Sequence, residues 1–168
     1  IGRALPSLPK PTRLSEQSWL AQQARLKTIT GRQGHEDLYV LRRELRTLMD
    51  SYVGVFRRGD DLAKALAEIR AIRARAAHAP IADKSATYNS NLFHALELDN
   101  LLDLAEVTVM GALTREESRG AHARRDFAVR DDEKWLKHTL AWHTPGGHPT
   151  LDYKPVTIDT WKPVERKY

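Results

Sequence analysis

Residues 115–126 have the sequence REESRGAHARRD, and the rest of the chain is organised around this stretch. It holds three carboxylates, four guanidinium groups, a hydroxyl and an imidazole around one glycine. Charged groups at this density make a poor helix or strand core, because each needs water or a charged partner. Gly120 permits a turn as the chain leaves the preceding helix. Two interpretations fit: a solvated surface whose groups satisfy one another, or fixed charged forks offered to a neighbouring surface.

Four segments upstream have the spacing of amphipathic helices. Ser15 predicts the start of the first, and Asp60 or Asp61 the start of the third. The predicted helices cover residues 16–29, 36–53, 61–77 and 91–113. The apolar positions expected to be buried are Trp19, Leu20, Leu26 and Ile29 in the first helix, Leu38, Leu41, Leu45, Leu48, Met49 and Tyr52 in the second, Leu62, Leu66, Ile69 and Ile72 in the third, and Leu92, Phe93, Leu96, Leu101, Leu104, Val107 and Met110 in the fourth. The charged residues of the third helix expected to face water are Lys64, Arg70, Arg73 and Arg75.

The expected fold is mainly α, with an antiparallel, spectrin-like up-down-up bundle of three helices over residues 36–113. Short connections favour antiparallel neighbours, and the broad apolar arc of the last helix predicts a central position for it. Residues 1–35 form a proline-containing linker and a helical arm, and residues 114–168 form the signature loop and a tail. In that tail, Asp131 is expected to cap a short turn. Residues 137–143 and 149–156 are expected to form a β-hairpin, which needs a surface to pack on.

The amino-acid composition excludes several kinds of site and function for this chain. The chain has 168 residues, a net charge of +5 and no cysteine, which excludes disulfides and thiolate metal sites. No apolar run approaches the ~20 residues of a transmembrane helix. The first residue is isoleucine, so we expect a piece of a longer protein or a processed chain.

The sequence shows no self-sufficient active site. It lacks the glycine-rich, P-loop, nucleophile-elbow and zinc-protease motifs. Ser118 and His122 have helical i, i+4 spacing, but no orienting group or oxyanion site accompanies them. His138, His143 and His148 with Asp152 suggest a metal site, which strand geometry disfavours because residues five apart face opposite ways.

A basic helical module that binds nucleic acid is an alternative from another class. Its cationic residues would be Arg42, Arg43, Arg46, Arg57, Arg58, Arg70, Arg73 and Arg75. Acidic residues interleave with these arginines, and aromatic residues for base stacking are sparse. We therefore do not expect a nucleic-acid partner.

The sequences of five segments resemble those of one protein family, and the segments follow one another in the same order as in that family. The run at 117–126 resembles the E-S-R-G-A-H-A-R-x-D signature of succinate dehydrogenase and fumarate reductase flavoprotein subunits. Residues 55–60, 96–102, 130–140 and 151–156 with 166–168 resemble its V-F-R-x-G, L-E-L-x-N-L, R-D-D-E-x-W-x-K-H-T-L and C-terminal segments. Residues 1–4 look like the end of the helix that closes the family's flavin-binding domain. The first half of the signature also resembles L-aspartate oxidase, which stays open as an alternative.

The resemblance implies a parent enzyme that moves hydride between succinate or fumarate and FAD. Its partners would be the FAD-binding domain of the same subunit, an iron–sulfur subunit and membrane anchor subunits. The location would be cytoplasmic, at the inner face of the membrane through those subunits. No residue here matches the family's catalytic, flavin-binding or substrate-binding elements. We expect this chain to bind no cofactor, and to be inactive and colourless when isolated, with self-association through uncovered apolar surface as a further expectation.

For the signature itself, the second interpretation becomes a specific hypothesis, in which these residues dock onto the flavin domain. Arginine forks can make bidentate, charge-assisted bonds to carboxylates or carbonyls, with neighbouring carboxylates orienting them. The predicted docking residues are Glu117, Ser118, Arg119, Gly120, His122, Arg124, Arg125 and Asp126.

Overall fold

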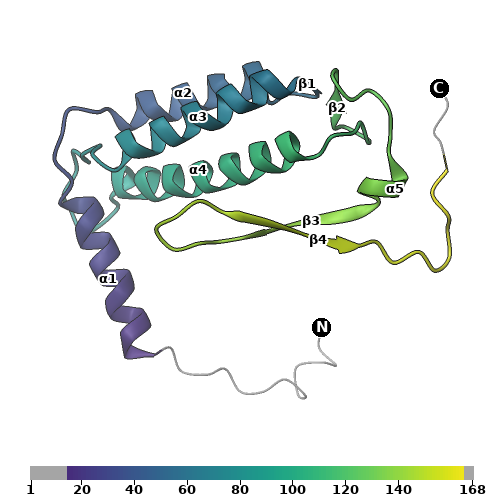
Figure 1. Ribbon diagram of the computed structural model, residues 1–168. Coiled ribbons are helices and arrows are strands. Elements are labelled where there is room, and N and C mark those ends of the chain that lie inside the picture. The colour runs from purple at the N-terminus through teal and green to yellow at the C-terminus, as the bar shows by residue number, and fades with distance from the viewer. Residues whose placement is uncertain (1–14, 165–168) are drawn as a thin grey trace.

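A computed structural model describes residues 15–164 of the chain (Figure 1). The expectations for residues 1–4, for the proline-containing linker and for residues 166–168 therefore lie outside the described residues. The described chain is mainly helical with two small sheets, as the sequence predicts. The elements are α1 (Glu16–Thr30), α2 (Leu38–Tyr52), β1 (Phe56–Arg57), α3 (Gly59–Ala76), α4 (Ser90–Thr114), β2 (Ala123–Arg124), α5 (Asp132–Trp135), β3 (Lys137–Trp142) and β4 (Thr150–Pro155).

Helices α2, α3 and α4 lie side by side, and each runs opposite to the one before it (Figure 1). The predicted stripe of α2 is confirmed in its buried residues Leu38, Leu41, Leu45 and Leu48. In α3, Leu62, Ile69 and Ile72 are buried as expected, together with two alanines. These side chains form one core with the buried face of α4.

The predicted buried face of α4 is wrong in phase. The buried residues of this helix are Ala95, Leu98, Leu102, Ala105, Glu106, Val109 and Ala112. By contrast, Phe93 is 63% exposed and Leu104 is 65% exposed. Apolar residues surround α4 almost completely, so periodicity alone does not select one face. Small alanines let α4 approach α2 and α3, which contact it along with α1 and support the predicted central position.

Helix α1 projects away from the other helices (Figure 1), and the second half of α1 contacts α4, where Arg25 lies 3.7 Å from Asp99. Ser15 caps it as predicted, accepting a hydrogen bond from the Ser18 amide at 3.1 Å. The expected burial of Trp19, Leu20 and Leu26 is wrong, since these side chains are 58%, 54% and 39% exposed. Ile29 is buried, because it lies where the helix joins the core.

Of the four charged residues of α3 expected to face water, Lys64 is exposed as predicted, but the three arginines are only partly exposed. Arg70 and Arg73 reach the carboxylate of Glu106, which is 1% exposed, at 2.9 Å and 3.3 Å. Arg75 joins Glu36 and Glu44 at 2.7 Å and 2.6 Å. A buried carboxylate needs such partners, so the helix–helix interface recruits arginines that periodicity alone assigns to solvent.

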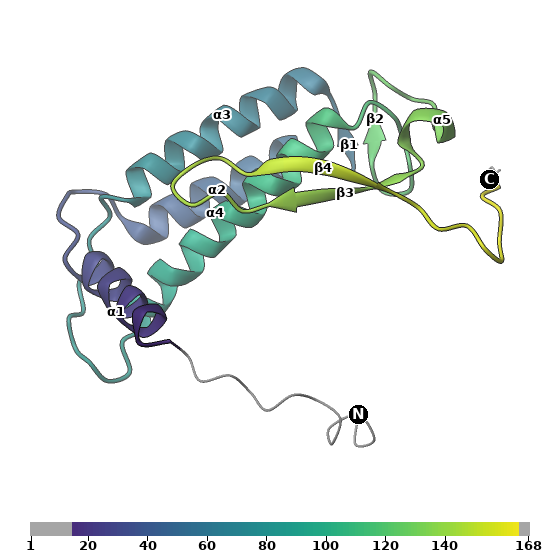
Figure 2. The same cartoon turned by 60° about the horizontal axis from the view of Figure 1, so that its bottom comes forward.

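Two strand pairs complete the fold. β1 and β2 form a two-residue parallel ladder that the sequence analysis did not predict. The predicted hairpin is confirmed: β3 and β4 are antiparallel, with Lys137 opposite Pro155 and Trp142 opposite Thr150. The hairpin lies alongside α4 in both views (Figures 1 and 2), and His148 in its loop contacts Glu106 at 2.8 Å. The hairpin therefore has the surface that it needs. Within residues 15–164, no helix combines the length and the apolar character needed to cross a membrane.

The corrected phase of α4 is testable with two leucines of that helix. Leu98→Ala should lower the free energy of unfolding by about 2–5 kcal/mol, because it opens a cavity in the core. Leu104→Ala should change it by less than about 0.5 kcal/mol, since an exposed side chain is truncated. Urea denaturation of both variants measures the difference. Equal losses would restore the face predicted from sequence.

Candidate functional site

Glu117 is the buried centre of the signature loop. Its side chain is 0% exposed and accepts hydrogen bonds from Arg115 at 2.6 Å, from Arg119 at 2.8 and 3.0 Å, and from the Asp131 amide at 2.9 Å. Burial alone raises the pKa of Glu117, but these donors outweigh it and hold the pKa below its usual value. The carboxylate therefore stays ionised and joins the loop to the segment that follows it.

Arg124 and Asp126 form a second centre, which we call the helix-end clamp. Arg124 is 3% exposed and holds the Asp126 carboxylate through two parallel bonds of 2.8 Å. Its remaining nitrogen donates to the carbonyls of Ala112 and Leu113 at the end of α4, both at 2.9 Å. The Arg124 guanidinium, the largest cause, and the Gly59 amide hold the pKa of Asp126 well below its usual range. The clamp thus places a cation where α4 ends and an anion where α3 begins.

The start of α3 depends on this anion. The helix begins at Gly59, one or two residues before the predicted caps, and Arg58 at the cap position makes no side-chain cap bond. Instead, the Gly59 amide donates to Asp126 at 3.0 Å across 67 residues of sequence. A Cβ on Gly59 would lie 2.9 Å from both Arg124 and Asp126. Glycine at this position therefore leaves the space that the two clamp side chains occupy. The prediction that Asp60 or Asp61 caps α3 is therefore wrong.

Ser118 and Gly120 shape the loop. Ser118 accepts a hydrogen bond from the Arg124 amide at 2.8 Å and donates to the Phe127 carbonyl at 2.8 Å. Gly120 has φ +58°, a left-handed conformation that favours glycine. It lies in a tight turn closed by backbone bonds between Arg119 and His122, six residues beyond the end of α4. Ser118 and His122 are therefore not on a common helix face, and Ser118 is bonded to the backbone.

His122 is held in one neutral form. Its Nε2 lies 3.2 Å from the Arg115 carbonyl, which can only accept, and its Nδ1 lies 2.7 Å from an Arg57 nitrogen, which can only donate. Burial lowers the pKa of His122, and the positive charges of Arg57, Arg124 and Arg115 lower it further against the carbonyl bond. The imidazole links β1 to the end of α4 and is not free to act as a base.

The two other signature arginines differ from each other. Arg119 fills its donors with Glu117 and with Asp132, the latter at 2.6 Å. Arg125 is exposed, and its guanidinium lies over the Phe56 ring at 5.6 Å. The guanidinium groups of Arg119 and Arg124 thus have partners within this chain, which corrects the expectation that both offer free forks. Arg125 is the exposed signature arginine.

The hairpin histidines do not gather. His138 lies in β3, His143 just beyond it, and His148 on Glu106. Across residues 15–164, no group of three histidine, aspartate or glutamate side chains has the geometry of a metal site. In chemical terms, the loop arrangement fixes structure: each polar side chain singled out from sequence, apart from Arg125, is bonded to the backbone or to an opposite charge.

Sequence comparison connects this loop to a family. The family described as "Fumarate reductase flavoprotein C-term" matches residues 42–168, which include the whole signature. The chain belongs to this family. A fumarate reductase flavoprotein subunit of Mycobacterium tuberculosis is 45% identical over 81% of this chain, and a succinate dehydrogenase flavoprotein subunit of Rickettsia conorii is 47% identical over 76%. The chain spans about a quarter of these relatives' length, 23% in both cases.

Comparison with solved structures agrees with this family assignment. The FrdA subunit of an E. coli quinol fumarate reductase mutant matches 92% of this chain with a TM-score of 0.84 and 32% identity, over 27% of its own length. An adenylylsulfate reductase of Archaeoglobus fulgidus shares the fold, with a TM-score of 0.75 at 18% identity. The named relatives favour the fumarate reductase and succinate dehydrogenase reading over L-aspartate oxidase and over a nucleic-acid module. The ion pairs of Arg70, Arg73 and Arg75 also neutralise the α3 part of the basic face considered for nucleic-acid binding.

The clamp should be essential to stability. Arg124→Gln removes the buried cation and leaves the end of α4 and Asp126 uncompensated, so we expect a loss of about 3 kcal/mol in the free energy of unfolding. Arg125→Gln, the adjacent exposed control, should cost less than about 0.5 kcal/mol. Denaturant titration checks both. A loss below 1 kcal/mol for Arg124→Gln, on the order of one net hydrogen bond, would contradict the clamp.

The lowered pKa of His122 predicts acid sensitivity. The unfolded chain gains a proton at a pKa of about 6.5, whereas the folded chain resists protonation until lower pH. This contribution to stability is complete above that pKa and is lost as pH falls toward the folded pKa. In His122→Gln the corresponding slope of stability against pH should disappear below about pH 6.5. Unchanged slopes in denaturant titrations across this range would contradict the assignment.

Proposed function

We propose that this chain is the C-terminal helical domain of a flavoprotein subunit that interconverts succinate and fumarate with FAD. The match of the flavoprotein C-terminal family over residues 42–168 carries the proposal. Relatives named fumarate reductase and succinate dehydrogenase flavoprotein subunits support it. The physiological direction, oxidation or reduction, is left open because both names occur among the relatives.

Within that subunit, the chain would brace the flavin domain and would not hold the flavin. Helix N-termini are the usual sites for a dinucleotide pyrophosphate. Here the chain's own side chains occupy them: Ser15 caps α1, Asp37 caps α2, Asn89 caps α4, and Asp126 meets the first amide of α3. This capping supports a chain that does not hold FAD, and in this proposal the chemistry belongs to the part of the relatives that the chain does not span.

The partners and location follow as part of the same proposal. An iron–sulfur subunit would receive the electrons, and anchor subunits would hold the complex at the cytoplasmic face of the membrane. The similar solved structures include quinol fumarate reductases, which supports an assembly that reacts with quinol. We also propose the division into an arm (1–35), a spectrin-like bundle (36–113) and a signature tail (114–168); the side-by-side α2, α3 and α4 support it.

In this proposal the signature loop docks on the flavin domain through its shape and its exposed edge. Glu117, Arg119 and the helix-end clamp hold the loop rigid. Arg125, stacked on Phe56, offers a guanidinium to a carboxylate or carbonyl of the flavin domain. Phe56 is 69% exposed, so the pair presents an apolar ring beside a cation, a combination enriched at interfaces.

Two variants separate docking from folding. Arg125→Ala should leave the isolated chain's stability within about 0.5 kcal/mol of the original, yet lower flavin retention in the complete subunit. Arg119→Ala should lower both, with a stability loss of about 1.5–3 kcal/mol, because it removes charge-assisted bonds to Glu117. Denaturation of the chain and visible flavin absorbance of the subunit are the measurements.

A matched experiment tests the absence of catalysis. The isolated chain should carry no flavin colour and should not reduce a dye in the presence of succinate. Bound flavin in the purified chain would contradict the bracing role. Full flavin retention by Arg125→Ala in the complete subunit would contradict docking through that residue.

A further inference from the structure

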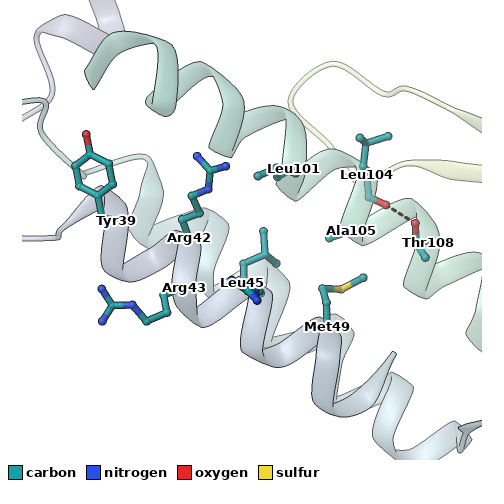
Figure 3. Close-up of a pocket in the computed structure, with 10 residues that line it drawn as sticks. Tyr39, Arg42, Arg43, Leu45, Met49, Leu101, Leu104, Ala105 and Thr108 are labelled. Carbon is teal, nitrogen blue, oxygen red and sulfur yellow. Dashed lines mark hydrogen bonds between the residues drawn. The ribbon is translucent and has the colours of Figure 1, made fainter. Parts of the chain in front are cut away.

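A groove runs between α2 and α4 with a volume of about 560 Å³ (Figure 3). Its ten lining residues all come from these two helices: Tyr39, Arg42, Arg43, Leu45, Arg46 and Met49 from α2, and Leu101, Leu104, Ala105 and Thr108 from α4. The floor is apolar. Leu104, which the corrected phase of α4 leaves 65% exposed, stands at the α4 side. An apolar floor open to solvent is typical of a surface that binds another element.

The rim of the groove has one sign of charge. Three of the ten lining residues are arginines on α2, and none is a carboxylate. Arg42 is paired with Glu97 outside the groove lining, and Arg46 lies 3.8 Å from Asp50 in a largely exposed pair. In the described part of the chain, Arg43 is exposed and no carboxylate forms an ion pair with it. Arg43 and the weakly paired Arg46 therefore favour an occupant with carboxylates along one flank.

The dimensions suit a helix. The lining positions on α2 run from Tyr39 to Met49, which at 1.5 Å per residue is a length of about 15 Å, or about three helical turns. An apolar groove of this length with a charged edge is the common receptor for an amphipathic helix, whose apolar residues recur at three- and four-residue spacing.

We propose that this groove binds an acidic amphipathic helix presented by a separate protein that docks on the subunit. Among residues 15–164, only α2 and α4 line the groove, and the hairpin lies on the other side of α4 from α2 (Figures 1 and 2). A second copy of the chain is a poor occupant, because its projecting helix α1 carries a single acidic residue, Glu16, beside Arg25 and Lys27. The groove is a feature of this chain alone, whereas its binding to a separate protein rests on the proposed place of the chain in a flavoprotein subunit.

The test uses the 168-residue chain and two designed helical peptides. Both carry leucines at i and i+4 spacing; one has glutamates along a flank, and the other has lysines at those positions. The acidic peptide should bind about fivefold or more tightly than the basic one, as two or three exposed ion pairs would give. Binding of the acidic peptide should shift the NMR signals of backbone amides in α2 and α4 of the chain. Added salt should reduce the preference for the acidic over the basic peptide.

Charge reversal gives the decisive comparison. The variant R43E/R46E changes two exposed residues of the rim and should reverse the preference, so that the basic peptide binds more tightly. The variant K134E/K154E has the same change in net charge on exposed residues of α5 and β4 and should keep the original preference. Leu104→Ser should weaken both peptides without unfolding the chain, since the side chain is exposed.

Three outcomes would overturn the proposal. One is equal affinity for the two peptides. Another is shift changes confined to α1 or the hairpin. The third is loss of binding in the complete flavoprotein subunit while the isolated chain still binds, because the subunit's own polypeptide would then cover the groove. Retention of binding in the complete subunit supports a separate partner.

Discussion

The bidentate ion pair between Arg124 and Asp126 compensates two helix ends at once. Because α3 and α4 are antiparallel, the start of α3 and the end of α4 lie at the same end of this helix pair (Figure 1). A helix start carries a partial positive charge and a helix end a partial negative charge. Asp126 meets the Gly59 amide and Arg124 meets the last carbonyls of α4, so each charge faces the pole that it neutralises. A buried guanidinium is stable here because its donors are filled.

The rest of the signature loop extends this joint toward the hairpin. Arg115 bonds Glu117 and also the carbonyls of Trp135 and Lys137, so the buried carboxylate connects the end of α4 to the start of β3. Neutral His122 bridges Arg57 of β1 to α4. This network gives a rigid end face, which fits a domain that braces a larger subunit. In the two proposals above, contact with partners is left to parts of the surface that the network does not use, namely Arg125 and the groove between α2 and α4.

Much of the helical framework was predictable because its signals are local. Ser15 as a cap, the leucine stripe of α2 and the cap of α5 at Asp131 each depend on residues within a few positions. The phase of α4 was not predictable, because Leu104 and Leu102 are chemically alike and α4 is apolar on nearly all sides. Packing against two neighbouring helices buries the alanines and Leu102 of α4.

The sequence by itself determined the helices, the hairpin and, through the spelling of the signature, the family. Short-range periodicity, caps and motif order contain that information. The tertiary structure alone decided what the signature charges do. Asp126 reaches Gly59 across 67 residues and Arg70 reaches Glu106 across 36, and no sequence period marks such pairs. Opposite charges pair wherever folding brings them together away from water, so their partners depend on the packing of the whole bundle.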